Sequence, residues 1–275
     1  MPVDVEAAVI ANRRLSADYN VLSLAAPGIA LHTRPGQFVM IKTTGGGDPL
    51  LRRPFSVFEI LRGPSREPIG ISILNKRIGV GTTLLSRVEA GARLACLGPL
   101  GHPFQPVSRP AEAWMIAGGV GLAPFVTLAE SLAANGVRTT LFYGARRADE
   151  LYCVELFDAF GVSVVLATED GSRGIHGRVT LPLERALAVR DAADLVTLYA
   201  CGPTPMMRAC AMLAARYGRA CEVSLEQTMG CGLGGCYSCV APVHSGDGRP
   251  HHTRTCVDGP VLAADRVVWD AIRGH

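Results

Sequence analysis

Short apolar runs alternate with turn signals through the first hundred residues of the chain. Glycine and proline at Ala26-Pro27-Gly28 and Pro35-Gly36 separate runs that are rich in β-branched or aliphatic residues. Short strands at this spacing predict a small antiparallel barrel, interrupted by one helical segment at Thr82–Val88. The expected strands are Val5–Ala11, Tyr19–Ala25, Gln37–Thr43, Phe55–Ile60, Ile69–Leu74 and Arg93–Leu97.

The pattern changes after the proline-rich segment His102–Pro110, which is typical of a linker. Strand-like and helix-like segments now alternate, which predicts a parallel sheet covered by helices. The expected strands are Trp114–Ala117, Thr139–Tyr143, Val162–Ala167 and Leu195–Ala200, and the expected helices are Pro124–Ala134, Asp149–Phe160 and Pro205–Tyr217. The remainder is rich in glycine and cysteine. We therefore expect a β-barrel over residues 1–102, an α/β domain over 111–221 and a small C-terminal domain over 222–275.

Composition narrows the functional classes. Hydrophobic residues make up 48% and charged residues 19% of the chain, so it can form real cores. The net charge of +3 comes from scattered basic residues, which indicates neither nucleic-acid binding nor a membrane surface. The first twenty residues have no signal-peptide core, and the uncharged run 113–129 contains glycines and Pro124, so we expect a cytoplasmic protein without a membrane segment. Its nine cysteines are then free or bound to metal.

Four cysteines near the C-terminus have the spacing of iron ligands. Cys231, Cys236 and Cys239 form C-x4-C-x2-C, and Cys256 follows. This is the plant-type spacing for a [2Fe–2S] cluster, and the glycines around it would let backbone amides approach the sulfurs. Structural zinc is the alternative, with His251 and His252 as further ligands. The remaining cysteines are interpreted as core residues: Cys96, Cys153, Cys201, Cys210 and Cys221.

Two turns have the composition of nucleotide-binding loops. Gly118–Pro124 follows an expected strand and opens a helix, so its glycines could bring the backbone close to a pyrophosphate. Ala200–Pro203 ends another strand before another helix. Two such strand ends side by side form a ligand crevice in an open parallel sheet. Either turn could equally be an ordinary strand-to-helix connection.

The barrel offers a second group of candidates at Arg53-Pro54-Phe55-Ser56. The guanidinium could hold a phosphate, Phe55 could pack on a flat ring, and Ser56 could hydrogen-bond a ring nitrogen. Gly79–Thr82, at the start of a helix, could cradle a second phosphate. The plain alternative is a surface arginine beside a buried phenylalanine.

Together these residues resemble the ferredoxin–NADP reductase superfamily, whose barrel motif is Arg-x-Tyr-Ser/Thr, here with Phe55 for Tyr. The short cysteine-rich end and Cys256–Pro260 look more specifically like the electron-transfer subunit of dihydroorotate dehydrogenase B. The resemblance implies an NAD-linked flavin and iron–sulfur oxidoreductase subunit. It implies FAD contacts at Arg53, Pro54, Phe55, Ser56, Leu74, Asn75, Lys76, Gly81 and Thr82, NAD contacts at Gly119, Gly121, Cys201, Gly202 and Pro203, and cluster ligands at Cys231, Cys236, Cys239 and Cys256. Asn75-Lys76 stands where Tyr-Arg is more usual.

The resemblance also implies a reaction and a partner. Hydride would pass between NAD(H) and FAD by alignment alone, without a catalytic side chain, and single electrons would pass through the cluster. The partner would be an FMN-containing catalytic subunit that interconverts dihydroorotate and orotate in pyrimidine biosynthesis, in a heterotetramer with two copies of each chain. The acidic Glu169-Asp170 favours NAD over NADP, although Arg146 and Arg147 could meet a 2′-phosphate.

Two rival functions stay open from the sequence. One is the small subunit of a transhydrogenase-type or sulfide dehydrogenase complex, some of which have Asp in place of one cluster cysteine. The other is a nucleotide-sensing module with structural zinc.

Overall fold

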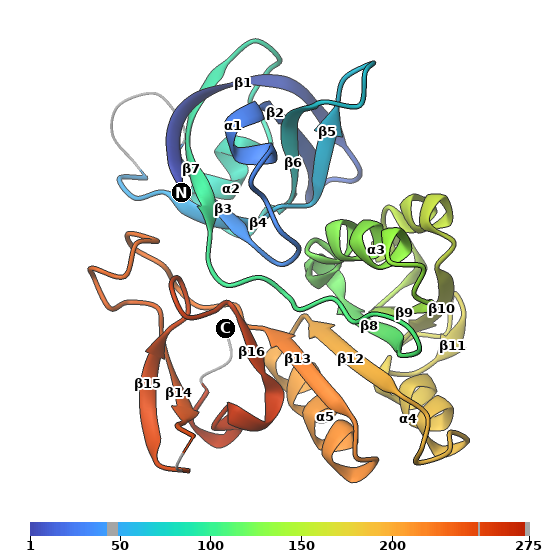
Figure 1. Cartoon of the computed structure of the whole chain (residues 1–275). Helices are drawn as coiled ribbons and strands as arrows, with labels where there is room; N and C mark the ends of the chain where they lie inside the picture. The colour runs from blue at the N-terminus through green and yellow to red at the C-terminus, as the bar shows by residue number, and fades with distance from the viewer. Residues whose placement is uncertain (43–48, 247, 273–275) are drawn as a thin grey trace.

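The computed structural model describes residues 1–42, 49–246 and 248–272, so Thr43, at the end of one expected strand, lies outside the described residues. Three parts follow one another along the chain (Figure 1). A curled antiparallel sheet comes first, a mostly parallel sheet with helices follows, and a small β-rich segment ends the chain. None of the helices in the described ranges has the length and apolar character needed to cross a membrane.

The first sheet is a half-barrel of strands in the order β4-β3-β7-β1-β2-β6-β5. Its interior packs alternate residues of these strands, among them Leu22, Val39 and Ile73. Its elements are β1 Val3–Arg14, β2 Tyr19–Ala25, α1 Pro27–Ala30, β3 Phe38–Lys42, β4 Arg53–Ser56, β5 Glu59–Arg62, β6 Pro68–Lys76, α2 Val80–Leu85 and β7 Arg93–Leu100.

One expected strand of this sheet, Phe55–Ile60, is divided into β4 and β5. Val57 and Phe58 between them are fully buried, and their backbone N–H groups donate to Gln37 O and Ser72 O. The chain changes partner strand at this point, from β3 to β6. The sequence does not reveal this change of partner strand, because Val57 and Phe58 are apolar and no turn signal interrupts the run between β4 and β5.

The second sheet has the order β11-β10-β9-β8-β12-β13-β16, parallel except for β16. The expected alternation of strands and helices is confirmed at β8, α3, β9, β10, β12 and α5. The sequence analysis did not identify α4 or β13. The elements are β8 Glu112–Gly118, α3 Phe125–Ala134, β9 Thr139–Ala145, β10 Ser163–Thr168, β11 Ile175–His176, α4 Thr180–Ala188, β12 Val196–Cys201, α5 Thr204–Arg216 and β13 Ala220–Ser224.

The expected helix Asp149–Phe160 is wrong. The segment forms two 3₁₀ turns, Ala148–Glu150 and Val154–Phe160. Cys153 between them has φ of 57°, a left-handed conformation that no continuous α-helix can include. The apolar spacing suited a helix, but the local backbone is set by packing against α3 and β10.

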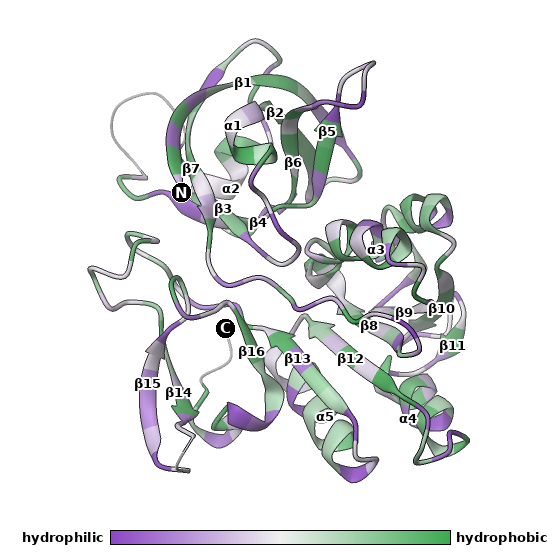
Figure 2. Ribbon diagram, in the orientation of Figure 1, coloured by the Kyte–Doolittle hydropathy of each residue, from purple (hydrophilic) through white to green (hydrophobic). Residues whose placement is uncertain are grey.

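The C-terminal segment is attached to the second sheet. It contains the hairpin of β14 Val240–His244 and β15 Pro250–Arg254, followed by β16 Val261–Ala263. β16 pairs antiparallel with β13, and β13 itself spans the expected boundary at residues 221 and 222. Figure 2 shows β15 as hydrophilic beside the more apolar β14.

A shared core joins the half-barrel to the parallel sheet. Tyr19, Val21 and Phe58 of the half-barrel belong to the same buried cluster as Leu122 and Phe125. The rings of Tyr19 and Tyr152 lie 4.6 Å apart, centroid to centroid, across this junction. The two sheets are therefore held in a fixed relation by apolar contact.

Candidate functional site

The four spaced cysteines come together in two pairs. Cys239 and Cys256 are both buried, and their Sγ atoms lie 3.2 Å apart. Cys231 and Cys236 lie further out on the same loop, close enough for hydrogen bonds with Cys231 to contribute to lowering the pKa of Cys236. In a [2Fe–2S] cluster, cysteines bind two iron atoms in pairs, so the arrangement fits that group.

Ser238 is the main polar neighbour of the outer pair, and the sequence analysis did not identify it. Its Oγ lies 3.2 Å from the Sγ of Cys236 and accepts the N–H of Gly230 at 2.8 Å. Bonds from the Ser238 hydroxyl and backbone lower the pKa of Cys236 to about 6, whereas burial raises the pKa of Cys256 to about 12. The backbone N–H of Leu233 donates to Cys231 Sγ at 3.3 Å.

Glycines make the cysteine loop possible. A Cβ at Gly230 would lie 3.1 Å from the Sγ of Cys236, and one at Gly232 would lie 2.6 Å from Cγ of Met40. Gly232 also has φ of 73°, which side chains rarely adopt. Gly230 therefore leaves room beside the sulfurs, and Gly232 lets the loop rest directly on the half-barrel.

The zinc alternative relies on two histidines that the structure leaves exposed. Zinc needs about four ligands around one ion. His251 and His252 are exposed on β15. Pairs of thiols suit two irons rather than one ion.

A single strand lies between the cysteine loop and the β4 motif. In β3, Val39 and Ile41 point into the half-barrel core, while Phe38 and Met40 pack with Cys239 and Cys256. The backbones of Phe38 and Met40 pair with Ser56 and Pro54 of β4. The loop therefore lies next to the strand that carries the candidate flavin motif.

No ladder joins β4 to β6 among the described residues, and we call this gap in the strand pairing the candidate flavin slot. β4 pairs only with β3, and β5 pairs with β6 only from Pro68 to Ser72. Among the described residues, no strand pairs with the outer edge of β4 or with Leu74–Lys76 on that side. These two free edges are near each other and offer unpaired backbone groups to a flat polar ring.

Arg53 and the start of α2 meet at one end of this slot. A Cβ at Gly81 would lie 3.4 Å from the Cγ of Arg53, so the glycine allows the arginine to pack against the helix. The Nη1 of Arg53 donates to Leu51 O at 3.1 Å and Arg52 O at 3.3 Å. The rest of its guanidinium has no bonded partner among the described residues, so it can receive a phosphate.

Asn75 has a structural part that the sequence analysis did not foresee. It is fully buried, and its Nδ2 donates to Asn20 Oδ1 at 2.7 Å and to Thr82 O at 2.9 Å. Asn20 donates in turn to Asn12 at 2.7 Å, and Asn12 donates to the carbonyls of Leu85 and Val88. We call Asn12, Asn20 and Asn75 the asparagine ladder. It fixes both ends of α2.

Thr82 and Lys76 complete the residues expected at the slot. The Oγ1 of Thr82 accepts the N–H of Ile78 at 2.9 Å, which closes the turn before α2. Lys76 is exposed, and its Nζ lies 5.5 Å from the centre of the Tyr19 ring. Phe55 and Ser56 are half-buried on β4.

The two expected nucleotide turns are brought into direct contact. β8 and β12 are neighbouring parallel strands, so Gly118–Gly121 and Cys201–Pro203 leave the sheet side by side. A Cβ at Gly121 would lie 2.1 Å from the carbonyl oxygen of Cys201. Gly119 has φ of 56° and open space where a side chain would be. The tight packing requires glycine at 121, while Gly119 leaves backbone open to a ligand.

Cys201 marks the inner wall of this crevice. Burial, and after it the charge of Glu226, raise its pKa to about 12, and a hydrogen bond to Ser224 opposes the rise. The thiol is therefore neutral at ordinary pH. Ser224 ends β13 and Glu226 follows it; neither was identified from the sequence, since their position depends on strand pairing.

Carboxylate side chains contact the Arg146-Arg147 segment that follows β9, at the carboxyl ends of β9 and β10. Arg147 pairs with Asp149 at 3.3 Å, and the backbone N–H of Arg146 donates to Glu150 at 3.2 Å. Hydrogen bonds from Ser172 lower the pKa of Asp170. Carboxylates at a strand end suit a ribose hydroxyl better than a 2′-phosphate.

Comparison with family models divides the chain as the geometry does. A model of an oxidoreductase NAD-binding domain matches residues 115–212. A model of the iron–sulfur cluster binding domain of dihydroorotate dehydrogenase B matches residues 226–268, which contain all four paired cysteines.

Relatives and solved structures cover nearly the whole chain. The dihydroorotate dehydrogenase B (NAD(+)) electron transfer subunit of Geobacillus thermodenitrificans is 39% identical over 264 residues, covering 94% of this chain and 96% of the relative. That of Desulforamulus reducens is 36% identical, covering 96% and 98%. A structure of NADH-dependent reduced ferredoxin-NADP oxidoreductase superimposes with a TM-score of 0.83 at 28% identity, covering 97% of this chain and 91% of the other.

Proposed function

Since the chain belongs to the family of electron transfer subunits of dihydroorotate dehydrogenase B (NAD(+)), we propose that it holds FAD in the slot between β4 and β6 and a [2Fe–2S] cluster on its cysteine loop. The family makes it an NAD-linked oxidoreductase subunit that serves pyrimidine biosynthesis. When bound, the flavin exchanges an electron pair with the nicotinamide and single electrons with the cluster.

Support for the flavin site comes from what the slot offers. Arg53 presents the part of its guanidinium beyond Nη1 to a pyrophosphate, beside the backbone of Gly81 and Thr82. The free edges of β4 and β6 present N–H and C=O groups to the polar side of the ring. Phe55 supplies an apolar surface. The Nδ2 of Asn75 is engaged in the ladder, whereas its Oδ1 is buried without a hydrogen-bond partner among the described residues, so this residue would offer the flavin its backbone and that one side-chain acceptor.

Support for the nucleotide site comes from the crevice. NAD(H) would lie with its phosphates over Gly119 and Gly121 and its nicotinamide near Cys201, Gly202 and Pro203. The neutral Cys201 thiol can pack against the nicotinamide without donating or accepting a proton. The chain's part is then to align the two rings and exclude water.

Support for the partner comes from the outer face of the cysteine loop. Cys236 is exposed there, with Leu233 and Tyr237 59% and 62% exposed. Large exposed apolar side chains around a metal ligand suit contact with another protein. We propose that an FMN-containing catalytic subunit covers this face, in a heterotetramer with two copies of each chain.

The observation that carries the proposal is the position of β3. Its residues touch the buried cysteine pair on one side and pair with the flavin motif on the other, so both groups would lie within a short electron-transfer distance. The test is anaerobic mixing of the iron- and FAD-loaded chain with NADH, followed by visible absorption. Flavin bleaching followed by cluster bleaching is expected. Flavin reduction with an unreduced cluster would contradict the path.

Two further measurements fix the substrate and partner. NADH should reduce the flavin at least ten times faster than NADPH, and equal rates would contradict the NAD preference. With the catalytic subunit added, dihydroorotate should drive NAD reduction. The structural likeness to the ferredoxin-NADP oxidoreductase makes a transhydrogenase-type complex the second candidate. Co-purification of a different flavoprotein, without dihydroorotate-dependent activity, would favour it.

A further inference from the structure

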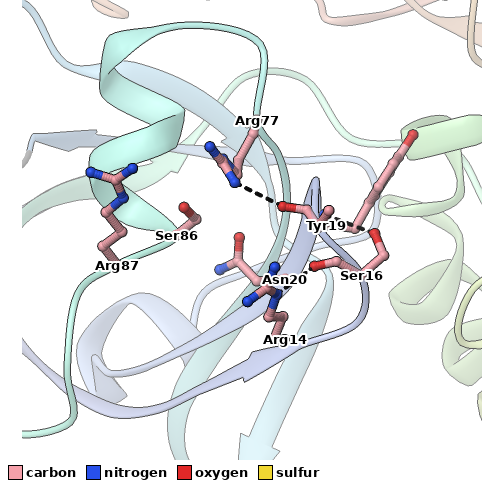
Figure 3. Close-up of a pocket in the computed structure, with 8 residues that line it drawn as sticks. Arg14, Ser16, Tyr19, Asn20, Arg77, Ser86 and Arg87 are labelled. Atoms are coloured by element: carbon pink, nitrogen blue, oxygen red, sulfur yellow. Dashed lines mark hydrogen bonds between the residues drawn. The ribbon is translucent and has the colours of Figure 1, made fainter.

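A pocket of about 250 Å³ lies on the half-barrel, away from the cysteine loop. It opens between the end of β1, the start of β2, the residue after β6 and the end of α2 (Figure 3). Its lining is Arg14, Ser16, Ala17, Tyr19, Asn20, Arg77, Ser86 and Arg87. We call it the arginine pocket.

Three guanidinium groups from separate elements converge on this pocket. Arg14 comes from β1, Arg77 follows β6, and Arg87 follows α2. None of the described residues that line the pocket is acidic, so the three positive charges are not neutralised within it. Like charges gathered in this way repel one another, and an anion between them would relieve that repulsion.

Two of the arginines are held in place yet keep free donors. Nη1 of Arg77 donates to Ala17 O at 2.9 Å, and Nε of Arg14 donates to Ser16 O at 2.8 Å. Nε of Arg77 is buried without a hydrogen-bond partner. The side chain of Arg87 has no bonded partner within the described ranges. A buried donor without an acceptor is unfavourable, and a bound acceptor would remove that cost.

The floor of the pocket is rigid. Asn20 belongs to the asparagine ladder and is 2% exposed. Oγ of Ser16 accepts the backbone N–H of Tyr19 at 3.2 Å, which fixes the β1–β2 turn. A ligand would therefore meet donors that are already positioned, and less ordering would oppose its binding.

The arginine pocket is separate from the sites described above. It lies at the C-terminal end of α2, with Ser86 and Arg87, whereas Arg53 and Gly81 meet at the other end. None of its residues falls within the segments matched by the NAD-binding and cluster-binding family models. The family assignment gives it no role.

We propose that the arginine pocket binds a small anion that carries phosphoryl groups. Guanidinium groups donate in parallel pairs to phosphate oxygens, and three of them match a multiply charged group better than a single carboxylate. The volume is below the roughly 300–1,000 Å³ of pockets for drug-sized ligands, which favours a compact anion or the phosphoryl end of a larger one.

The test is calorimetric titration of the FAD- and cluster-loaded chain with inorganic pyrophosphate. Saturable binding is expected, and Arg77→Ala and Arg87→Ala should each weaken it at least tenfold. Arg185→Ala is the matched control, since Arg185 is an exposed arginine on α4 with no bonded partner among the described residues. It removes the same charge and should leave the affinity unchanged within twofold.

Further arms separate this site from the nucleotide sites. Saturating NADH should not displace pyrophosphate, and bound FAD should not prevent its binding. Absence of saturable binding, an equal loss in Arg185→Ala, or competition by NADH or FAD would each overturn the proposal. Arg87 is exposed, so the Arg87→Ala protein should fold normally. Retained flavin absorbance in this variant checks that it does.

Discussion

The cysteine loop and the candidate flavin slot are each proposed to hold a redox group, but they supply the contacts to that group differently. In the loop, the ligands are side chains close together in sequence, and glycines supply the room around them. In the slot, the groups come from β4, β6 and α2, and much of what is offered is backbone at free strand edges.

The supports of the two regions differ as well. The loop rests on Met40 and Leu100 through Gly232, an apolar contact at the surface of the half-barrel. The slot depends on the buried asparagine ladder, which holds α2 by hydrogen bonds. Changes in the loop should therefore affect the metal alone, whereas changes beneath the slot should affect flavin binding and stability together.

The largest expected effect is loss of the cluster in Cys239→Ala. Cys239 is buried beside Cys256, so no other ligand can replace it. Iron and acid-labile sulfide should fall to near zero, while FAD stays bound because the slot is untouched. Cys210→Ala is the control. Cys210 is buried among the residues of the parallel sheet, in a different cluster from Cys239 and Cys256, so this variant should keep full iron. Simultaneous loss of FAD would break the proposed independence of the two regions.

Next is the loss of flavin affinity in Arg53→Ala. A hydrogen bond to a charged group is worth about 1.5–3 kcal/mol, so FAD affinity should fall by roughly 10- to 100-fold. Fluorescence titration of the apo-flavin chain measures this, and the iron content should not change. Arg185→Ala is again the charge-matched control. An unchanged FAD affinity would show that the pyrophosphate lies elsewhere.

A smaller effect is expected beneath the slot, in Asn75→Ala. The change leaves Asn20 Oδ1 and Thr82 O without a buried donor, which should lower the free energy of unfolding by about 1–3 kcal/mol. FAD binding should weaken as well, because α2 is released. Urea unfolding measures the first and fluorescence titration the second. Asn135→Ala, at an exposed helix end, is the control. If the Asn75→Ala protein is less stable but binds FAD with full affinity, the ladder does not support the slot.

The smallest effect distinguishes core thiols from ligand thiols. Burial raises the pKa of Cys96 to about 12, with Arg52 opposing the rise, so the folded state keeps a proton that the unfolded chain releases near pH 8.5–9. The contribution of this thiol to the free energy of unfolding is therefore fully present below that pH and is lost as the pH rises toward 12. Between pH 8 and 10 this thiol should cost about 1.5 kcal/mol, measured by urea unfolding. In Cys96→Ala the decrease should be shallower by that amount; an identical slope would contradict the assignment.

Where sequence patterns reflect local structure, they were informative. The strands β2 and β9, the helix α5 and the glycine turns follow from residue spacing, because each depends on neighbours along the chain. The expected helix at Asp149–Phe160 was wrong because a left-handed Cys153 interrupts it. The pocket formed by Arg14, Arg77 and Arg87 had no sequence signal, since its members come from three elements.

The sequence alone therefore identified the candidate cluster cysteines, the two candidate nucleotide turns and the order of the β-rich, α/β and cysteine-rich parts, since these depend on side-chain type and short spacing. Tertiary structure decided which strand edges stay free, which asparagines support α2 and which arginines converge. Strand pairing and burial act between residues far apart in the chain, and they place the buried Nδ2 of Asn75 in a ladder with Asn20.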